Sequence, residues 1–162
     1  MEQTRGTYVQ KACAYLTRPN GDFLAFESPE HNGLQVPKGT IEGAESPREA
    51  VFREIVEESG IGSIGPTTHL TSDVWCRRRS PLKHYVRHFY HAEVYDSRDT
   101  FTHTVTGTGE EVGLEFEYQW IDHETASSRQ FALDLDDYLY LLPAGGAHSS
   151  AIDAPRVDGF SD

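Results

Sequence analysis

The sequence predicts one mixed α/β domain in which short strands and helices pack as a sandwich. The chain has 162 residues, 37% of them hydrophobic, and its eight Tyr and eight Phe are enough for a substantial core. Several segments alternate apolar and polar residues with the period of a strand, and one well-marked helix falls between them. Strands, a helix, further strands and a final helix together indicate a mixed sheet covered by helices.

The expected strands are separated by tight turns and short loops. Arg18–Gly21 contains Asn-Gly, which favours the positive φ of a tight turn. Residues 31–33 and the glycine-bearing segment 38–45 are expected to be loops, and Pro37 ends the strand before the second of them. We expect strands at residues 8–16, 22–27, 34–36, 68–77, 83–94 and 116–121.

The C-terminal half is expected to contain one long loop and a second helix. Residues 96–111 are polar and rich in Thr and Gly, which is typical of a loop. Apolar residues recur at helical spacing over 125–142, which predicts a helix with Asp134, Asp136 and Asp137 on its solvated face. We therefore place the domain at residues 1–142 and expect residues 143–162, rich in Gly, Ala and Ser, to be a flexible tail.

The first helix has clear signals at both ends. Ser46 is a capping residue, Pro47 suits the first helical position, and Glu49 completes a capping box three residues after the serine. Gly60 is expected to end the helix in the left-handed conformation. The helix is therefore predicted between Ser46 and Gly60.

Three carboxylates share one edge of this helix. At about 100° per residue, Glu54, Glu57 and Glu58 fall within an arc of about 100°. Like charges at this spacing destabilise a helix by about 0.2–0.5 kcal/mol per pair, and the helix dipole disfavours them near the C-terminus. The edge is either a solvated acidic face or a site for a hard divalent cation. A separate apolar arc, which we expect to face the core, contains Val51, Phe52, Ile55 and Val56.

A sequence motif decides between these alternatives. From Gly39 the chain reads G-x5-E-x7-R-E-U-x-E-E-x-G-U, where U is a bulky aliphatic residue. Seven fixed residues at about 6% usage each match by chance on the order of 10⁻⁹ per starting point. This is the Nudix box without a departure at any defined position, and the chain resembles a Nudix hydrolase over most of residues 8–142. The matching residues are Gly39, Glu45, Arg53, Glu54, Ile55, Glu57, Glu58, Gly60 and Ile61.

The resemblance implies a Nudix-type α/β/α sandwich with a mixed sheet and a catalytic loop-helix-loop. It implies hydrolysis, dependent on Mg²⁺ or Mn²⁺, of a pyrophosphate bond in a nucleoside diphosphate linked to another group, by attack of water at phosphorus. By position, Glu54, Glu57 and Glu58 would bind the metal together with the main-chain carbonyl of Lys38, and Arg53 and Glu45 would form an orienting salt bridge. Gly39 and Gly60 match backbone positions at which a side chain would intrude.

The general base and the substrate-binding residues are less well defined. Members of the family take the proton with a carboxylate of the box or with a glutamate from a distant loop, for which Glu110 and Glu111 are the candidates here. Lys38 is expected either to reach a phosphate or to be a solvated loop lysine. The basic segment Arg77, Arg78, Arg79 and Lys83 is expected either to bind further phosphates or to be a solvated loop. Trp75 and Tyr85 either stack on a base or pack in the protein, and Trp120 is expected in the core.

Composition limits the partners and the location. A net charge of −12 argues against an extended nucleic-acid-binding surface, but it does not exclude a small anionic nucleotide, because divalent cations reverse the local field. No apolar run is long enough to span a membrane and the N-terminus lacks the pattern of a secretory signal, so a cytoplasmic protein is expected. Cys13 and Cys76 are expected to be buried free thiols, with one disulfide as the alternative. A catalytically silent Nudix fold that binds a nucleotide as a sensor is the alternative function.

Overall fold

A computed structural model of the chain describes residues 7–77 and 82–143. Its strands form one eight-stranded sheet in the order β5-β6-β1-β2-β8-β7, with β3 paired to β2 and β4 paired to β1. The β1–β6 pair is parallel and the other pairs are antiparallel. The strands are β1 Thr7–Thr17, β2 Phe23–Ser28, β3 His31–Gln35, β4 Lys38–Thr40, β5 Thr68–Arg77, β6 Lys83–Glu93, β7 Thr100–Thr104 and β8 Glu115–Ile121.

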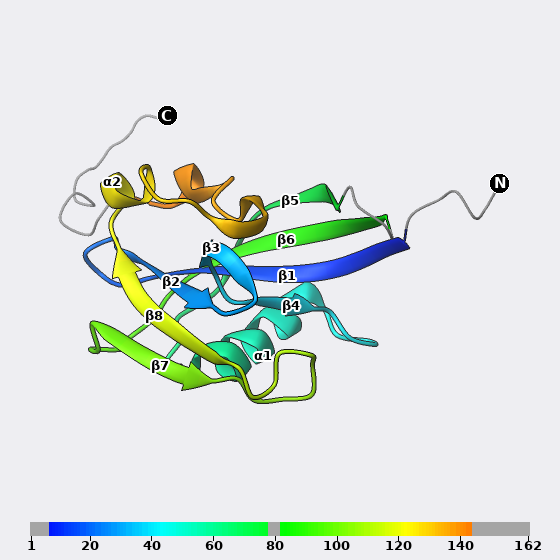
Figure 1. Ribbon diagram of the computed structural model, residues 1–162, viewed down its shortest axis with the longest axis horizontal. Coiled ribbons are helices and arrows are strands. Elements are labelled where there is room, and N and C mark those ends of the chain that lie inside the picture. Colours follow the sequence, from blue (N-terminus) through cyan, green and yellow to red (C-terminus); the bar gives the residue numbers. More distant parts are fainter. Residues whose placement is uncertain (1–6, 78–81, 144–162) are drawn as a thin grey trace.

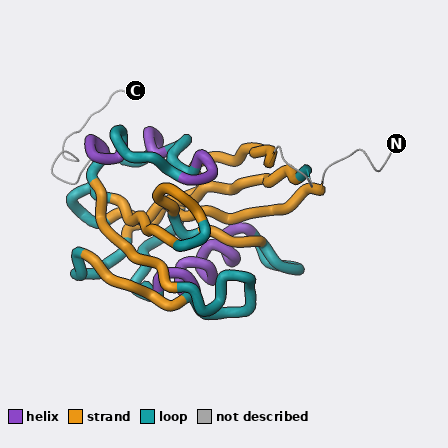
Figure 2. The backbone as a smooth tube through the Cα atoms, viewed as in Figure 1, coloured by secondary structure: helices purple, strands orange, loops and turns teal. Residues whose placement is uncertain are grey.

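Helices cover the sheet on two sides, as the sequence predicts (Figures 1 and 2). Helix α1, Pro47–Ser59, packs on one face, and the buried residues there include Ala12, Leu16 and Tyr90. The C-terminal segment packs on the other face and contains α2, His123–Ala126, and the 3-10 turns η2, Ala132–Asp134, and η3, Leu139–Leu141. The sandwich therefore has two apolar cores with the sheet between them.

Three loop predictions are wrong in part. Lys38–Thr40, at the start of the segment 38–45 expected to be a loop, form β4 and pair with β1. Residues 31–33 belong to β3, where His31 pairs with Ser28, and the strand continues through Leu34. Residues 100–104 form β7, which pairs with β8 inside the segment expected to be a long loop. The β7 sequence Thr-Phe-Thr-His-Thr does alternate, but its polar composition concealed the strand.

The predicted second helix over residues 125–142 is also wrong. Leu133 and Asp134 have φ values of 58° and 54°, which end any α-helix at this point. The Tyr15 hydroxyl donates to the Leu135 carbonyl at 2.6 Å and Arg87 donates to the Leu133 carbonyl at 2.9 Å. Because these buried side chains bind main-chain carbonyls that a helix would use internally, the segment keeps its apolar contacts without helical geometry.

Asp134, Asp136 and Asp137 are exposed, as expected, although no helix carries them, and two of them also contact other side chains. Asp134 accepts a hydrogen bond from the Trp75 indole at 2.8 Å, and Asp137 lies 3.5 Å from Arg87. Trp120 is partly buried against the core, as expected. The two cysteines are free thiols, with Cys13 buried and Cys76 partly exposed.

Some expectations fall on residues that the structure does not describe. Arg78, Arg79 and the tail from residue 144 lie outside the described ranges. Within residues 7–77 and 82–143, no helix is long and apolar enough to cross a membrane.

Candidate active site

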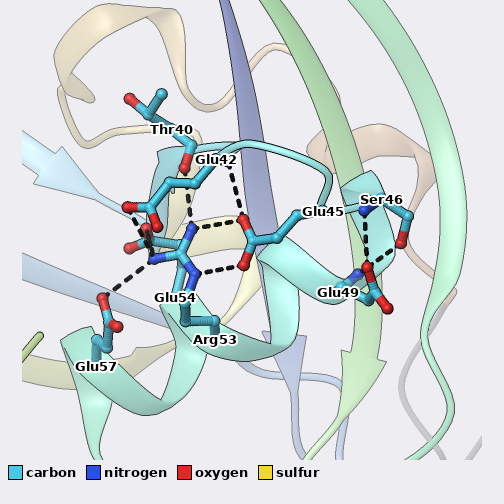
Figure 3. Close-up of polar contacts among 8 residues, drawn as sticks. All are labelled: Thr40, Glu42, Glu45, Ser46, Glu49, Arg53, Glu54 and Glu57. Carbon is cyan, nitrogen blue, oxygen red and sulfur yellow. Dashed lines mark hydrogen bonds and ion pairs between the residues drawn. The ribbon is translucent and has the colours of Figure 1, made fainter.

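Both predicted ends of α1 are confirmed. The Ser46 hydroxyl accepts from the Glu49 amide at 3.1 Å, and the Glu49 carboxylate accepts from the Ser46 amide at 2.9 Å (Figure 3). At the other end Gly60 is left-handed, with φ of 75°, and its N–H donates to Val56. These caps set the register of the helix and thereby the direction of every acidic side chain on it.

The buried face of α1 differs from the expected apolar arc. Val51 and Ile55 are buried, but Phe52 and Val56 are 39% and 47% exposed. Glu54 and Glu58 take their place, with exposed fractions of 8% and 2%. The buried stripe therefore runs along the edge that carries the carboxylates, so the acidic residues lie against β4 and the sheet rather than in solvent.

Arg53 connects the carboxylates of the motif to the preceding loop (Figure 3). Its Nε and Nη2 donate to the two oxygens of Glu45 at 2.6 and 2.9 Å, and Nη2 also donates to the Thr40 carbonyl at 3.0 Å. Its Nη1 contacts Glu54 at 2.8 Å and Glu57 at 3.3 Å. One planar guanidinium thus ties the loop to the helix and fixes two acidic side chains.

Close approach of the backbone explains two glycines near the carboxylates. A Cβ at Gly39 would lie 1.9 Å from the carboxyl carbon of Glu54, and one at Gly107 would lie 2.4 Å from that of Glu57. Gly60, by contrast, faces the ring of His103. The carboxylates of α1 therefore occupy space that side chains on β4 and on the 105–113 loop would otherwise fill.

The 105–113 loop brings a fourth carboxylate to the site. Its main chain is held on α1 by a hydrogen bond from the Thr106 amide to the Glu57 carbonyl at 3.0 Å. Glu111 comes within hydrogen-bonding reach of Glu58, whose carboxylate also accepts from the Lys38 amide at 3.1 Å. Glu110 lines the same cavity.

Electrostatics distinguish the acidic residues. Burial, opposed by Arg53, raises the pKa of Glu54 to about 7. Burial and the neighbouring Glu111 raise the pKa of Glu58 well above its usual range. The hydrogen bonds from Arg53 lower the pKa of Glu45 from 4.5 to about 2. Glu45 is therefore charged at neutral pH, whereas burial favours the protonated forms of Glu54 and Glu58 and a bound cation would favour their ionised forms.

The carboxylates line a cavity of about 680 Å³ that extends across the sheet to β5. Lys11 and Lys38 line it next to the acidic residues, and Arg77 and Lys83 from the basic segment line it as well. Lys11 donates to the Thr40 hydroxyl at 3.0 Å, and Lys38 donates to Gln35 at 2.9 Å. The sequence pattern did not predict Lys11 as a site residue, because a lysine in a strand is normally solvated. Only its strand register places it here.

The residues present fit a divalent cation. Glu54, Glu57, Glu58 and Glu111 supply hard oxygen donors in one cavity, and Gly39 leaves room for the Glu54 carboxylate. Within the described ranges, however, no three acidic, His or Cys side chains already surround one point as ligands. Glu54 and Glu57 instead share the Arg53 Nη1, so binding a cation requires these side chains to turn.

Comparison with known proteins agrees with the motif. A family model described as NUDIX domain matches residues 7–142. The chain belongs to the Nudix family. An RNA pyrophosphohydrolase from Psychrobacter sp. (strain PRwf-1) is 34% identical over 76 residues, and the match covers 47% of this chain and 43% of that relative. The matched region therefore spans less than half the length of that curated Nudix relative.

Solved structures share the Nudix fold. The Nudix domain of Shewanella oneidensis NrtR, complexed with ADP ribose, aligns with a TM-score of 0.62 and 14% identity over 87% of this chain and 90% of that one. A Nudix hydrolase from Nitrosomonas europaea aligns with a TM-score of 0.60 and 18% identity over 83% and 86% of the two chains. At these identities the likeness concerns the fold alone.

Proposed function

We propose that the chain is a Mg²⁺- or Mn²⁺-dependent pyrophosphohydrolase acting on a nucleoside diphosphate linked to a further group. The observation that carries this proposal is the cluster of carboxylates on α1, in which Glu54 and Glu58 are buried and Glu57 is partly buried. Arg53 contacts Glu54 and Glu57, and the Lys38 amide donates to Glu58. Crowding and burying acidic side chains is costly unless a cation neutralises them. Lys11 and Lys38, which line the same cavity, favour an anionic substrate.

The chemistry follows from the placement of these groups. When bound, the divalent cation would neutralise phosphate charge and make water more acidic. Glu54, Glu57, Glu58 and the carbonyl of Lys38 would hold it. Arg53 and Glu45 keep the helix and loop in register. A carboxylate takes a proton from the attacking water, the new bond forms to phosphorus, and the anhydride P–O bond breaks to release the second phosphate group.

Glu58 and Glu111 are the two candidates for the proton acceptor, because they face each other in the cavity. A pair of variants distinguishes them. If the box carboxylate is the base, Glu58→Gln loses turnover by about 10²-fold or more and Glu111→Gln by much less. An equal or greater loss in Glu111→Gln assigns the proton transfer to the loop.

Cations along the cavity support a substrate with several phosphates. Lys38 lines the cavity next to the carboxylates, Arg77 on β5 lines it as well, and Arg78 and Arg79 follow in sequence. The matched relative from Psychrobacter is named for RNA pyrophosphate hydrolysis, and a nucleotide carrying a 5′ polyphosphate is accordingly one substrate to test. Dinucleoside polyphosphates and nucleotide sugars are the others.

A phosphate-release screen over these substrates with Mg²⁺ and Mn²⁺ tests the proposal. Glu57→Gln and Glu58→Gln should each lower turnover by at least about 10²-fold with the fold intact. Glu117→Gln is the matched control, because Glu117 is exposed on β8 away from the cavity. Nucleotide binding without turnover of any substrate would replace the proposal with the silent sensor.

A further inference from the structure

The cavity has an aromatic wall at the end away from the carboxylates. Trp75 on β5 and Tyr85 on β6 are direct partners across the two strands, with ring centroids 5.9 Å apart and planes 27° apart. Both side chains line the cavity. Trp75 is partly exposed, so it presents aromatic surface to the cavity.

The Trp75 indole is held in one orientation by a strained turn. Its Nε1 donates to the Asp134 carboxylate at 2.8 Å, and Arg87 lies 5.8 Å from the ring centroid. Asp134 and Leu133 both adopt positive φ, a conformation that costs of order 1–3 kcal/mol at each non-glycine residue. Arg87 holds this turn by donating to the Leu133 carbonyl. Strain of this kind persists where the surrounding structure requires one geometry, and here it fixes the indole on the cavity wall.

Packing alone does not account for this arrangement. Trp120, the second tryptophan, donates its indole N–H to the Arg98 carbonyl at 2.9 Å and packs against the core without lining the cavity. Trp75 is not among the residues that pack against either core. Of the two indoles, Trp75 alone is positioned to meet a ligand.

Lysine 11 lies between the aromatic wall and the carboxylates. Its ammonium is 5.4 Å from the centroid of the Tyr85 ring and 3.0 Å from the Thr40 hydroxyl, next to Gly39. In the register of the sheet, Lys11 pairs with Thr40 on one side and Arg87 on the other, two residues along from Tyr85. Strand spacing then places Tyr85 roughly 12 Å from Thr40. Along the cavity, the acidic side chains are followed by a cationic one and then by the aromatic ones.

We infer that Trp75 and Tyr85 form a nucleobase-binding wall and that Lys11 binds the phosphates between the base and the carboxylates. This inference rests on the proposed function, because it assigns the base and the phosphates of the same substrate. The aromatic faces offer stacking, which is tolerant of base identity. Lys11 neutralises phosphate charge in a strongly acidic protein. The substrate class is therefore one with a nucleobase, and a polyphosphate without a base should bind less well.

Tryptophan fluorescence tests this inference directly, because the chain contains two tryptophans. In Trp120→Phe the remaining tryptophan is Trp75, and in Trp75→Phe it is Trp120. Both variants are titrated with ADP, GDP and inorganic pyrophosphate, with and without Mg²⁺. We expect saturable quenching by both nucleotides in Trp120→Phe, little change with pyrophosphate, and no change in Trp75→Phe. No quenching in Trp120→Phe, or equal quenching by pyrophosphate, overturns the inference.

Calorimetric affinities separate stacking from phosphate binding. Trp75→Ala should weaken ADP binding by about 10-fold, whereas Trp75→Phe, which keeps an aromatic face, should lose less. Neither variant should change the affinity for pyrophosphate. Lys11→Met should weaken both ligands. If Trp75→Ala does not fold, the affinities of Trp75→Phe and the fluorescence titration still test whether Trp75 stacks on the base.

These measurements do not require turnover. Base-dependent binding in a chain that hydrolyses no substrate would reject the proposed function and keep the aromatic wall. Hydrolysis without base-dependent binding would keep the proposed function and reject the wall.

Discussion

Replacing Gly39 with alanine is the sharpest test of how the site is built. The added Cβ would lie 1.9 Å from the carboxyl carbon of Glu54 and 2.0 and 2.3 Å from its oxygens. Carbon atoms need about 3.5 Å, so the Glu54 carboxylate must move by about 1.5 Å. The move separates Glu54 from Arg53, whose contact is 2.8 Å.

The expected magnitude follows from that displacement. A misplacement of about 1 Å can cost about 10²-fold in rate, so Gly39→Ala should lose at least that much turnover and bind Mn²⁺ more weakly. Stability should change little, because Gly39 does not have positive φ and the clashing atoms belong to a side-chain end. We expect a shift in Tm of no more than about 2–4 °C.

The assay combines phosphate release, Mn²⁺ binding by calorimetry, and thermal unfolding by circular dichroism. Gly62→Ala is the control, because Gly62 has no atom within 4 Å of the added Cβ and no positive φ. Glu54→Gln made in the Gly39→Ala background should add little further loss, since both changes act on the same carboxylate. Wild-type turnover and Mn²⁺ affinity in Gly39→Ala would refute the reasoning.

Three further predictions concern ion pairs. Arg53→Ala and Glu45→Ala should each lower turnover. The double variant should be no worse than the more impaired single variant, because the two residues form one ion pair. A loss in the double variant equal to the product of the two single losses would show that Arg53 and Glu45 act separately. Because the pKa of Glu45 is depressed to about 2, its stabilising contribution is present above pH 4.5 and is lost as the pH falls toward 2. The difference in Tm between wild type and Glu45→Gln should therefore narrow from pH 7 to pH 3, and a constant difference would contradict the ion pair. Arg87 is buried and donates to Asp73 at 2.9 and 2.7 Å. Arg87→Met should therefore lower the free energy of unfolding, measured in urea, by about 3–5 kcal/mol. A decrease below about 1 kcal/mol would show that the ion pair does not stabilise the fold.

Local chemistry made much of the fold predictable. The ends of α1 depend on neighbours within four residues, and Ser46, Glu49 and Gly60 specify them directly. The strands 68–77 and 83–94 are confirmed because their alternating pattern is long. The prediction of a helix over 125–142 was wrong because carbonyls of this segment accept hydrogen bonds from Tyr15 and Arg87, which are distant in sequence.

The motif spacing determined the family and the candidate carboxylates without reference to the tertiary structure. Which way α1 turns those carboxylates was decided only by packing, which exposes Phe52 and buries Glu58. Hydrophobicity alone predicts a buried Phe52 and an exposed Glu58. Glu58 can be buried because a group on another element, the Lys38 amide, donates a hydrogen bond to its carboxylate and offsets the energetic cost of burial.

The rest of the cavity depends on contacts between segments far apart in the chain. Lys11 reaches it through its register with Thr40, Glu111 through a loop held on α1, and Trp75 through a bond to Asp134 fifty-nine residues away. No local pattern encodes these approaches, since each residue is ordinary for the strand or loop that carries it. The sequence by itself therefore identified the family and the candidate carboxylates at the acidic end, and only the tertiary structure decided which cationic and aromatic groups face them.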